Sequence, residues 1–357
     1  MTGQHPRPRT RATVAALAVG ALLTTACTTV PASSSETSSD RTGGWQERAP
    51  MALERQELYP EVVDDLIYVA GGLLSPNTGV SAHFDAYDPA ADAWHRLATL
   101  PQARHHIGLA EADGSLYAVG GFSGGFPRWR AESDSFVYSP RDDTWSAGVD
   151  LPEPRAEFVI ESVRDQVFVI GGRVRETPDA TTFTTHVDSD RNEMFDPATG
   201  LWTRLAPAPT LRNSAASAVV DDRIYVIGGR EFSLAEDGSA VQENVATVEV
   251  YDPATDEWET VAPLPEARGG LAAAVHDGSI YVFGGEQHDP APVVYDDVWR
   301  YDPETDEWTT AGELPTPRHG LGAATVGDVI HTFGGGTEVG GNFASARHEA
   351  FAPERES

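Results

Sequence analysis

The sequence predicts an all-β fold assembled from six copies of one structural unit. A Trp, an Arg ten residues later and a Gly-Gly pair sixteen residues after the Arg recur six times, with no residue gained or lost. The distance from each Gly-Gly pair to the next Tyr/Phe-x-Pro triplet instead varies from 16 to 24 residues. A rigid frame with one loop of variable length is typical of a solenoid or a propeller. The recurring residues are Trp45, Trp94, Trp145, Trp202, Trp258 and Trp308; Arg55, Arg104, Arg155, Arg212, Arg268 and Arg318; and the pairs beginning at Gly71, Gly120, Gly171, Gly228, Gly284 and Gly334.

The segment before the repeats resembles a bacterial lipoprotein signal, in which the Cys after the cleavage site is lipidated. Three Arg residues within 7–11 precede an apolar stretch, 12–23, that is too short to span a bilayer comfortably. Cys27 is the only cysteine of the chain. The alternative is an ordinary secretory signal, because Thr24 stands where that family usually has Leu. We expect a signal at 1–27, a Ser/Thr-rich linker at 28–43, a propeller at 44–353 and a tail at 354–357, with the protein exported and lipid-anchored on the extracytoplasmic face of the membrane.

The net charge of -30 excludes one class of partner. Nucleic acids require a basic surface, so we expect no nucleic-acid binding. Many acidic residues occupy repeated turn positions, such as Asp252-Pro253 and Asp306-Glu307. We interpret the charge as a solvated surface that keeps the protein soluble.

Each copy predicts four short antiparallel strands. In the copy that begins at Arg268, small apolar residues lead to the turn signal Asp277-Gly278, and a β-branched and aromatic segment follows. After the variable loop, a second pair of strands is joined by a turn that contains Asp302-Pro303. The strands expected in this copy cover residues 271–275, 280–283, 298–301 and 308–311.

These features together resemble the kelch repeat. They are the Gly-Gly pair, the Tyr/Phe-Asp-Pro turn, a Trp seven residues after that aromatic, and a Pro-x-x-Arg link. The resemblance implies a six-bladed β-propeller. Phe351 has no Trp after it and Trp45 has no Tyr before it, so we expect the strand at Trp45 to complete the last blade and close the ring. The seven-residue spacing occurs at Tyr87/Trp94, Tyr138/Trp145, Phe195/Trp202, Tyr251/Trp258 and Tyr301/Trp308.

Ligand binding is expected on the face that carries the variable loops. Because strand direction alternates, these loops and the six Arg residues should share one face, and the Asp-Pro turns should lie on the other. We expect the Arg residues to surround the channel mouth, where they either bind loop carbonyls or capture carboxylates. Trp129 either stacks on a ligand or covers a blade edge. The other candidate ligand-binding residues are His105, Asn213, His319, Arg173, Arg230 and Glu286.

Three blades differ from the rest two residues after the Arg. Blades four to six have Ser or Gly there, but blades one to three have Glu57, His106 and Glu157. Strand period two would place Glu61 and Glu161 on the same faces as Glu57 and Glu157. The three residues are either candidate acid–base catalysts or the lining of a hydrated channel.

Several catalytic motifs are absent. The sequence contains no HExxH, zinc-type Cys/His spacing, Walker loop or Gly-x-Ser-x-Gly elbow, and we expect neither a metal nor a cofactor. The copper radical oxidases, to which bacterial kelch proteins are often likened, need a Tyr cross-linked to a Cys, and no Cys follows residue 27.

We therefore expect a binding module for a carbohydrate or an acidic peptide or protein. One alternative is a metal-independent sugar-acid mutarotase or epimerase that resembles sialate mutarotase. There, Glu57, His106 or Glu157 would transfer protons while Arg155 or Arg212 holds the carboxylate. The other alternative is a scaffold for a partner protein.

Overall fold

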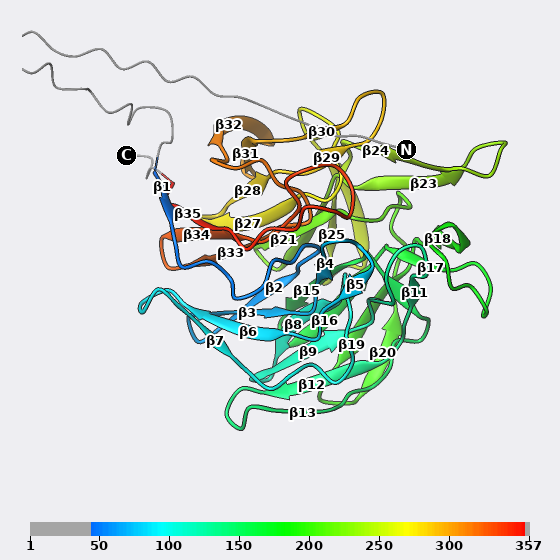
Figure 1. Cartoon of the computed structure of the whole chain (residues 1–357), viewed down its shortest axis with the longest axis horizontal. Coiled ribbons are helices and arrows are strands. Elements are labelled where there is room, and N and C mark those ends of the chain that lie inside the picture. The colour runs from blue at the N-terminus through cyan, green and yellow to red at the C-terminus, as the bar shows by residue number, and fades with distance from the viewer. Residues whose placement is uncertain (1–43, 354–357) are drawn as a thin grey trace, which may run out of the picture. The chain divides into compact units, whose positions relative to one another are not determined.

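Six four-stranded antiparallel sheets, one for each repeat, form the frame of the computed structural model (Figure 1). The structure describes residues 44–353, so the predicted signal with Cys27, the linker and the tail lie outside the described residues. The prediction of an all-β fold with four strands in each copy is confirmed. The 3-10 helix η1 (Phe183–Thr185) is the one helical element within 44–353.

The first three sheets belong to copies one to three. They contain β2 (Pro60–Val63), β3 (Leu66–Ala70), β6 (Phe84–Asp88) and β7 (Ala93–Arg96); β8 (Gly108–Ala112), β9 (Ser115–Val119), β12 (Ser135–Ser139) and β13 (Thr144–Ala147); and β15 (Val159–Val163), β16 (Gln166–Ile170), β19 (Asn192–Asp196) and β20 (Leu201–Arg204).

The other three sheets contain β21 (Ala216–Val220), β22 (Arg223–Ile227), β25 (Val248–Asp252) and β26 (Glu257–Val261); β27 (Ala272–His276), β28 (Ser279–Phe283), β31 (Asp297–Asp302) and β32 (Glu307–Glu313); and β33 (Gly322–Val326), β34 (Val329–Phe333), β35 (His348–Phe351) and β1 (Trp45–Glu47).

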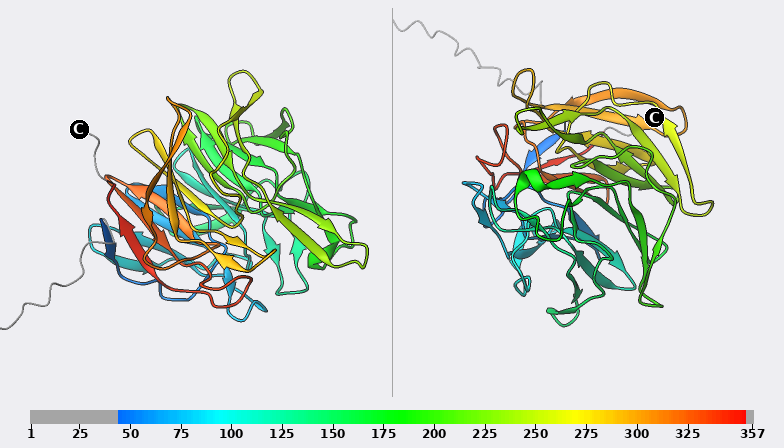
Figure 2. Two further views of the ribbon diagram at one scale, coloured as in Figure 1. Left: turned by 90° about the horizontal axis from the view of Figure 1, so that it is seen from above. Right: turned by 90° about the vertical axis from the view of Figure 1, so that its right-hand side faces the viewer.

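Each inner strand lies beside the inner strands of the two neighbouring blades. The order is β2, β8, β15, β21, β27 and β33, and β33 contacts β2 again. Figures 1 and 2 show the sheets arranged about this common centre. The hydrophobic core lies between adjacent sheets, because buried side chains from neighbouring blades share each cluster. The first strand, β1, pairs antiparallel with β35, and the ring of Trp45 stacks on Phe351 at 4.9 Å.

The recurring Trp residues link successive blades. In five of the six, the indole N–H donates to a carbonyl oxygen that lies four residues after the Trp of the preceding copy. This bond requires a fixed spacing on both blades, which accounts for the constant length of that part of the repeat. The pairs are Trp94 to Ala49, Trp145 to Ala98, Trp202 to Val149, Trp258 to Ala206 and Trp308 to Ala262, at 2.8–3.3 Å.

The Gly-Gly pairs form a second link between blades. Both glycines of every pair have a φ between 56° and 109°, the region that favours glycine. The second glycine donates its N–H to the carbonyl oxygen of the Arg in the next copy, as in Gly72 to Arg104 at 2.8 Å. Gly335 donates in the same way to Arg55, at 2.9 Å, so the sixth copy also contacts the first.

The variable loops carry structure of their own. They form four short hairpins: β4 (Leu73–Leu74) with β5 (Gly79–Val80), β10 (Phe122–Ser123) with β11 (Arg130–Ala131), β23 (Arg230–Leu234) with β24 (Ala240–Asn244), and β29 (Glu286–Gln287) with β30 (Val293–Val294). In the third copy, the loop strands β17 (Arg173–Arg175) and β18 (His186–Asp188) form a three-stranded sheet with β14 (Arg155–Ala156), which carries the recurring Arg.

Candidate functional site

The six recurring Arg residues are buried inside the blades. Their exposed fractions are 0–2%. Five of them donate to the carbonyl oxygen of the first glycine sixteen residues later, as Arg318 does to Gly334 at 2.8 Å. Each also pairs with a carboxylate of its own blade. Of the two alternatives for these Arg residues, the structure shows the hydrogen bonds to loop carbonyls, and the carboxylates that they contact belong to the fold. The pairs are Arg55–Asp85, Arg104–Asp134, Arg155–Glu193, Arg212–Glu249, Arg268–Asp297 and Arg318–Glu349.

The residue two positions after each Arg adopts a left-handed backbone in all six blades. Glycine and serine fill this position in blades four to six. In blades one to three, three bulky residues take this strained conformation, with φ of 61° at Glu57, 49° at His106 and 55° at Glu157. Such strain persists where the surrounding structure enforces it and is concentrated at functional sites.

Backbone hydrogen bonds join several of these residues across the blades. Ser214 N donates to Glu157 O, Gly270 N to Ser214 O, Gly320 N to Gly270 O, and Glu57 N to Gly320 O, at 2.6–3.1 Å. We call this chain of residues the belt. The belt lies at the ends of the inner strands. Glu57 and Glu157 stand before the first residues of β2 and β15, whereas Glu61 and Glu161 lie inside these strands. The prediction that each pair shares one strand face is therefore wrong, because the left-handed backbone at Glu57 and Glu157 separates them from the strand.

The side chains of Glu57, His106 and Glu157 lie together, as the sequence predicted. His106 Nε2 lies 2.9 Å from Glu57 Oε2 and 3.7 Å from Glu157 Oε1. His106 Nδ1 lies 2.7 Å from Nδ1 of His105, so a hydrogen on one of the two nitrogens is shared between them. The arrangement is a histidine held between two carboxylates, with a second histidine behind it.

The surroundings shift the proton affinities of these groups in opposite directions. Burial lowers the pKa of His106, but Glu57 and Glu157 outweigh burial and the net shift is upward. Burial raises the pKa of Glu57, but His106 outweighs it and the net shift is downward. Burial, with a smaller contribution from His106, places the pKa of His105 well below its usual value. The site thus favours the charged pair of His106 and Glu57 beside a neutral His105.

A cavity of about 400 Å³ opens above Glu57, His106 and Glu157, and all six variable loops contribute to it. We call it the loop-face pocket. This confirms that the variable loops gather on one side of the propeller. Its lining also includes Leu73, Asn77, Phe126, Trp129, Phe183, Arg230, Ala240, Gln242, Glu286, His288, Asp289 and residues 340–342.

Aromatic side chains form one wall of the loop-face pocket. The ring of Trp129 lies 6.0 Å from Phe126 and 5.2 Å from Phe183, nearly perpendicular to both. Trp129 is only 8% exposed, whereas Phe126 is 44% exposed. Trp129 packs on His105 at 4.6 Å and also lines the cavity, and stacking of a ligand on it stays a prediction.

Charged side chains from blades four and five also line the pocket. Arg230 Nη2 donates to Glu286 Oε1 at 2.6 Å, and His319 Nδ1 lies 3.5 Å from the same oxygen. Glycines make room for this pair, because a Cβ on Gly269 would collide with the Arg230 side chain. Burial raises the pKa of Glu286, but His319 and Arg230 outweigh burial and hold it far below its usual range.

Four other candidate residues lie behind the pocket rather than in its lining. Arg173 is buried between Phe183 and Phe232, at 4.6 and 3.9 Å from the ring centres. Asn213 donates to Asp188 at 2.8 Å. His105 and His319 are 0% and 1% exposed. These residues support the lining from behind.

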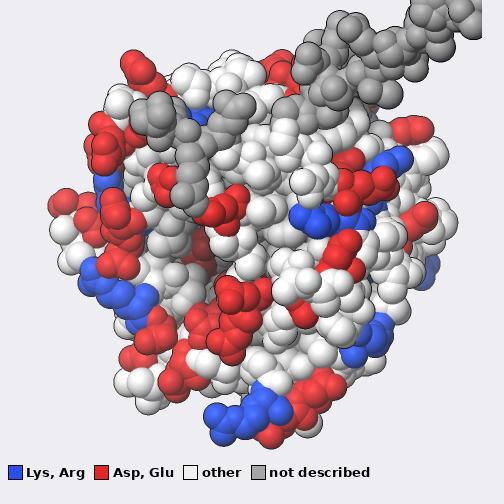
Figure 3. Space-filling model, turned by 90° about the vertical axis from the view of Figure 1, so that its left-hand side faces the viewer, with Lys and Arg blue, Asp and Glu red and all other residues white. Residues whose placement is uncertain are grey.

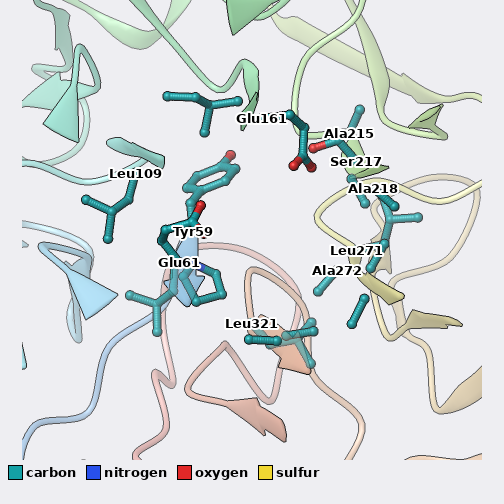
Figure 4. A pocket seen from close by; sticks show the side chains of 18 of the residues that line it. Tyr59, Glu61, Leu109, Glu161, Ala215, Ser217, Ala218, Leu271, Ala272 and Leu321 are labelled. Carbon is teal, nitrogen blue, oxygen red and sulfur yellow. The ribbon is translucent and has the colours of Figure 1, made fainter. Parts of the chain in front are cut away.

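A second cavity, of about 330 Å³, lies on the other side of the belt among the inner strands. Figure 4 shows the side chains of Tyr59, Glu61 and Glu161 pointing into it, with Leu109 and Ala218 among the apolar lining. Burial raises the pKa of Glu61 to about 8, with a further contribution from Glu161, whose own pKa burial raises to about 7. We call this second cavity the channel cavity, and its two carboxyls bind protons much more tightly than ordinary carboxyls do.

Replacing Glu61 by Gln should stabilise the protein at alkaline pH. A carboxyl whose pKa is higher in the folded protein than in the unfolded chain lowers stability once it ionises, so the stability loss grows as pH rises from about 4.5 to 8. Because the pKa rises from 4.5 to about 8, we expect a gain of up to about 5 kcal/mol at pH 9 and less than about 1 kcal/mol at pH 5. Denaturant unfolding at the two pH values measures the effect, with the exposed Glu236→Gln as control. An equal change at both pH values would contradict it.

On the face shown in Figure 3, acidic side chains are more abundant than basic ones, and several lie around a hollow. Within residues 44–353, no helix is long and apolar enough to cross a membrane. The same part of the chain contains no group of three or more His, Cys, Asp or Glu side chains placed to hold a metal ion.

Comparison with known proteins identifies related sequences and folds. A family model described as the KLHDC2/KLHL20/DRC7 Kelch-repeats domain matches residues 149–335, more than half of the chain, and a Kelch motif model matches 60–101 and 103–152. "Kelch-like protein terF" of Aspergillus terreus is 30% identical over 65% of this chain and 50% of its own length. "Kelch-like protein 36" of Bos taurus is 30% identical over 68% of this chain and 37% of its own length.

The chain therefore spans about half or less of the length of these two relatives. Among solved structures, "Structure of YjhT" superposes with a TM-score of 0.68 over 84% of this chain and 95% of that one, at 19% identity. This likeness concerns the fold alone.

Proposed function

The chain belongs to the kelch-repeat family, and from this premise we propose that its propeller is a binding module whose ligand, a carbohydrate, enters the loop-face pocket. Kelch repeats supply a propeller scaffold for interactions. The observation that carries the proposal is a single pocket, formed by all six variable loops, in which an aromatic wall stands over a floor of carboxylates and histidine.

This composition suits a saccharide. A sugar ring has an apolar C–H face that packs on aromatic rings and hydroxyl groups that donate to carboxylates. A volume of about 400 Å³ falls in the usual range for small-ligand sites. The acidic peptide receives less support, because the six recurring Arg residues already pair with carboxylates of the fold.

Replacing Phe126 by Ala should weaken saccharide binding about fivefold, since loss of one stacking face removes about 1 kcal/mol. Phe126 is 44% exposed, so the fold should tolerate the change. Calorimetry with a panel of neutral, acidic and amino sugars measures the affinity. Leu201→Ala is the matched control, because Leu201 is 64% exposed and lines neither cavity. Equal affinity in the wild type and Phe126→Ala would contradict the site, and no binding of any sugar would contradict the ligand class.

The second candidate is a metal-independent mutarotase or epimerase. The observation that favours it is His106 held between Glu57 and Glu157, with opposite shifts of the His106 and Glu57 pKa values. Such a pair can donate and accept protons at neighbouring positions of a sugar. NMR of anomer exchange tests it, and exchange no faster than in buffer would exclude the reaction for the sugars tried.

We also propose that the protein acts outside the cytoplasm, anchored by a lipid on Cys27. The support is the sequence alone: a lone cysteine four residues after the end of an apolar stretch, and a Ser/Thr-rich linker before the repeats. Detergent-phase partitioning of the protein expressed in a bacterial host, compared with Cys27→Ser, separates a lipid anchor from an ordinary secretory signal.

A further inference from the structure

The loop-face pocket contains more acidic than basic groups. Glu57, Glu157, Glu286 and Asp289 line it, and Arg230 is the one Arg or Lys in its lining. Arg230 is already paired with Glu286 at 2.6 Å. The pocket therefore offers an incoming anion no free guanidinium, and its remaining carboxylates repel negative charge.

Glu157 has unused hydrogen-bonding capacity. Its residue is 4% exposed, and its Oε2 accepts no hydrogen bond from the described residues. The nearest cationic atoms are Arg173 Nη1 at 3.6 Å from Oε2 and His106 Nε2 at 3.7 Å from Oε1, both longer than a hydrogen bond. A buried carboxylate in this state is costly unless a donor reaches it. Its left-handed backbone holds it beneath the pocket all the same.

The aromatic wall also suits a cation. Trp129, Phe126 and Phe183 line the same pocket as Glu157. The electron-rich faces of such rings attract cations within about 6 Å. The Arg173 guanidinium already lies over Phe183 at 4.6 Å, so this cluster accommodates positive charge from its buried side.

We propose that the ligand carries a primary ammonium group, held by Glu157 and the aromatic wall. The inference rests on the proposed carbohydrate-binding function and names the ligand as an amino sugar. A primary ammonium supplies the N–H donors that Glu157 lacks, which a quaternary ammonium cannot do. The hydroxyl groups of the same sugar form hydrogen bonds with the other polar groups of the pocket floor.

Three sugars with one ring and different charge test the proposal: glucosamine, N-acetylglucosamine and glucuronic acid. Calorimetry on the full chain should show glucosamine binding about tenfold more tightly than the other two, the usual gain from a charge-assisted hydrogen bond. Equal or tighter binding of N-acetylglucosamine or glucuronic acid would overturn the ammonium proposal and leave the carbohydrate function standing.

A pair of non-sugar probes distinguishes failure of the ammonium proposal from failure of the carbohydrate function. Cyclohexylamine and cyclohexanol share a ring and differ in the amine. Tighter binding of cyclohexylamine, with no sugar bound, would support the ammonium preference and overturn the carbohydrate function. Absence of binding for all five probes would overturn both.

Glu157→Gln should abolish the preference, because the amide keeps the shape and loses the charge. We expect glucosamine to weaken about tenfold and N-acetylglucosamine less than about threefold. Glu157→Ser is the second variant, in case the first does not fold, because Ser214 takes the same left-handed position in blade four, and thermal melting reports on folding. Glu161→Gln removes a carboxylate from the channel cavity instead and should leave the preference unchanged. An unchanged preference in folded Glu157→Gln, or in Glu157→Ser if the amide variant does not fold, would overturn the proposal.

Discussion

Replacing Arg318 by Met should destabilise the protein by about 3–5 kcal/mol, the usual cost of removing one partner of a buried ion pair. Arg318 is fully buried and donates to Gly334 O at 2.8 Å, to Thr332 Oγ1 at 3.0 Å and to Glu349 Oε2 at 2.7 Å. Without it, the Glu349 carboxylate and a loop carbonyl remain buried with fewer donors. Guanidinium unfolding measures the loss.

Two further variants show whether the buried charge is the cause. Arg318→Met combined with Glu349→Gln should recover much of the stability, because the double variant no longer buries an unpaired carboxylate charge at position 349. Arg164 pairs with Asp222 on the surface, where the two side chains are 67% and 51% exposed. Arg164→Met should therefore change stability by less than about 1 kcal/mol. A loss for Arg318→Met as small as this would contradict the structural role of the recurring Arg.

The fold was predictable from the sequence because its contacts repeat in register. The Trp to carbonyl bond, the Gly-Gly turn and the Arg to glycine bond each join positions at fixed spacing, so the pattern appears six times in one chain. The carboxylate partners of the Arg residues also left a signal. An acid lies two residues before the Tyr or Phe in four copies, as in Glu349 before Phe351, and four residues before it in the other two. That signal indicates that each recurring Arg pairs with a carboxylate of its own blade and is not free to bind a ligand carboxylate.

The site was predictable only where it interrupts the repeat. Glu57, His106 and Glu157 stand where other copies have Ser or Gly, and the structure brings them together. Phe183 and His288 also line the pocket, but they lie in variable loops. No register relates those loops to one another, so their side chains meet only through the closed arrangement of blades. Spacing along the chain cannot reveal such contacts.

The glycines of blades five and six form part of the site, and Gly320→Ala should damage it without changing any polar group. A Cβ on Gly320 would approach the carboxyl atoms of Glu57 to 2.7–2.8 Å, closer than real contacts allow. The Glu57 carboxylate should therefore move away from His106. Because Glu57 is the main group that raises the pKa of His106 against burial, that pKa should fall. We expect saccharide affinity to fall about tenfold or more, since the floor of the pocket is rearranged.

Gly327→Ala separates this effect from backbone strain. The φ of Gly327 is 58° and that of Gly320 is 55°, but a Cβ on Gly327 would meet no atom within 4 Å. Both variants should lose about 1 kcal/mol of stability, because alanine is strained in the left-handed region. Only Gly320→Ala should lower the pKa of His106, measured by NMR titration, and weaken binding. If the two variants share one His106 pKa and one affinity, then the glycine at 320 serves the turn alone, and the carboxylate–histidine floor does not depend on the space it leaves.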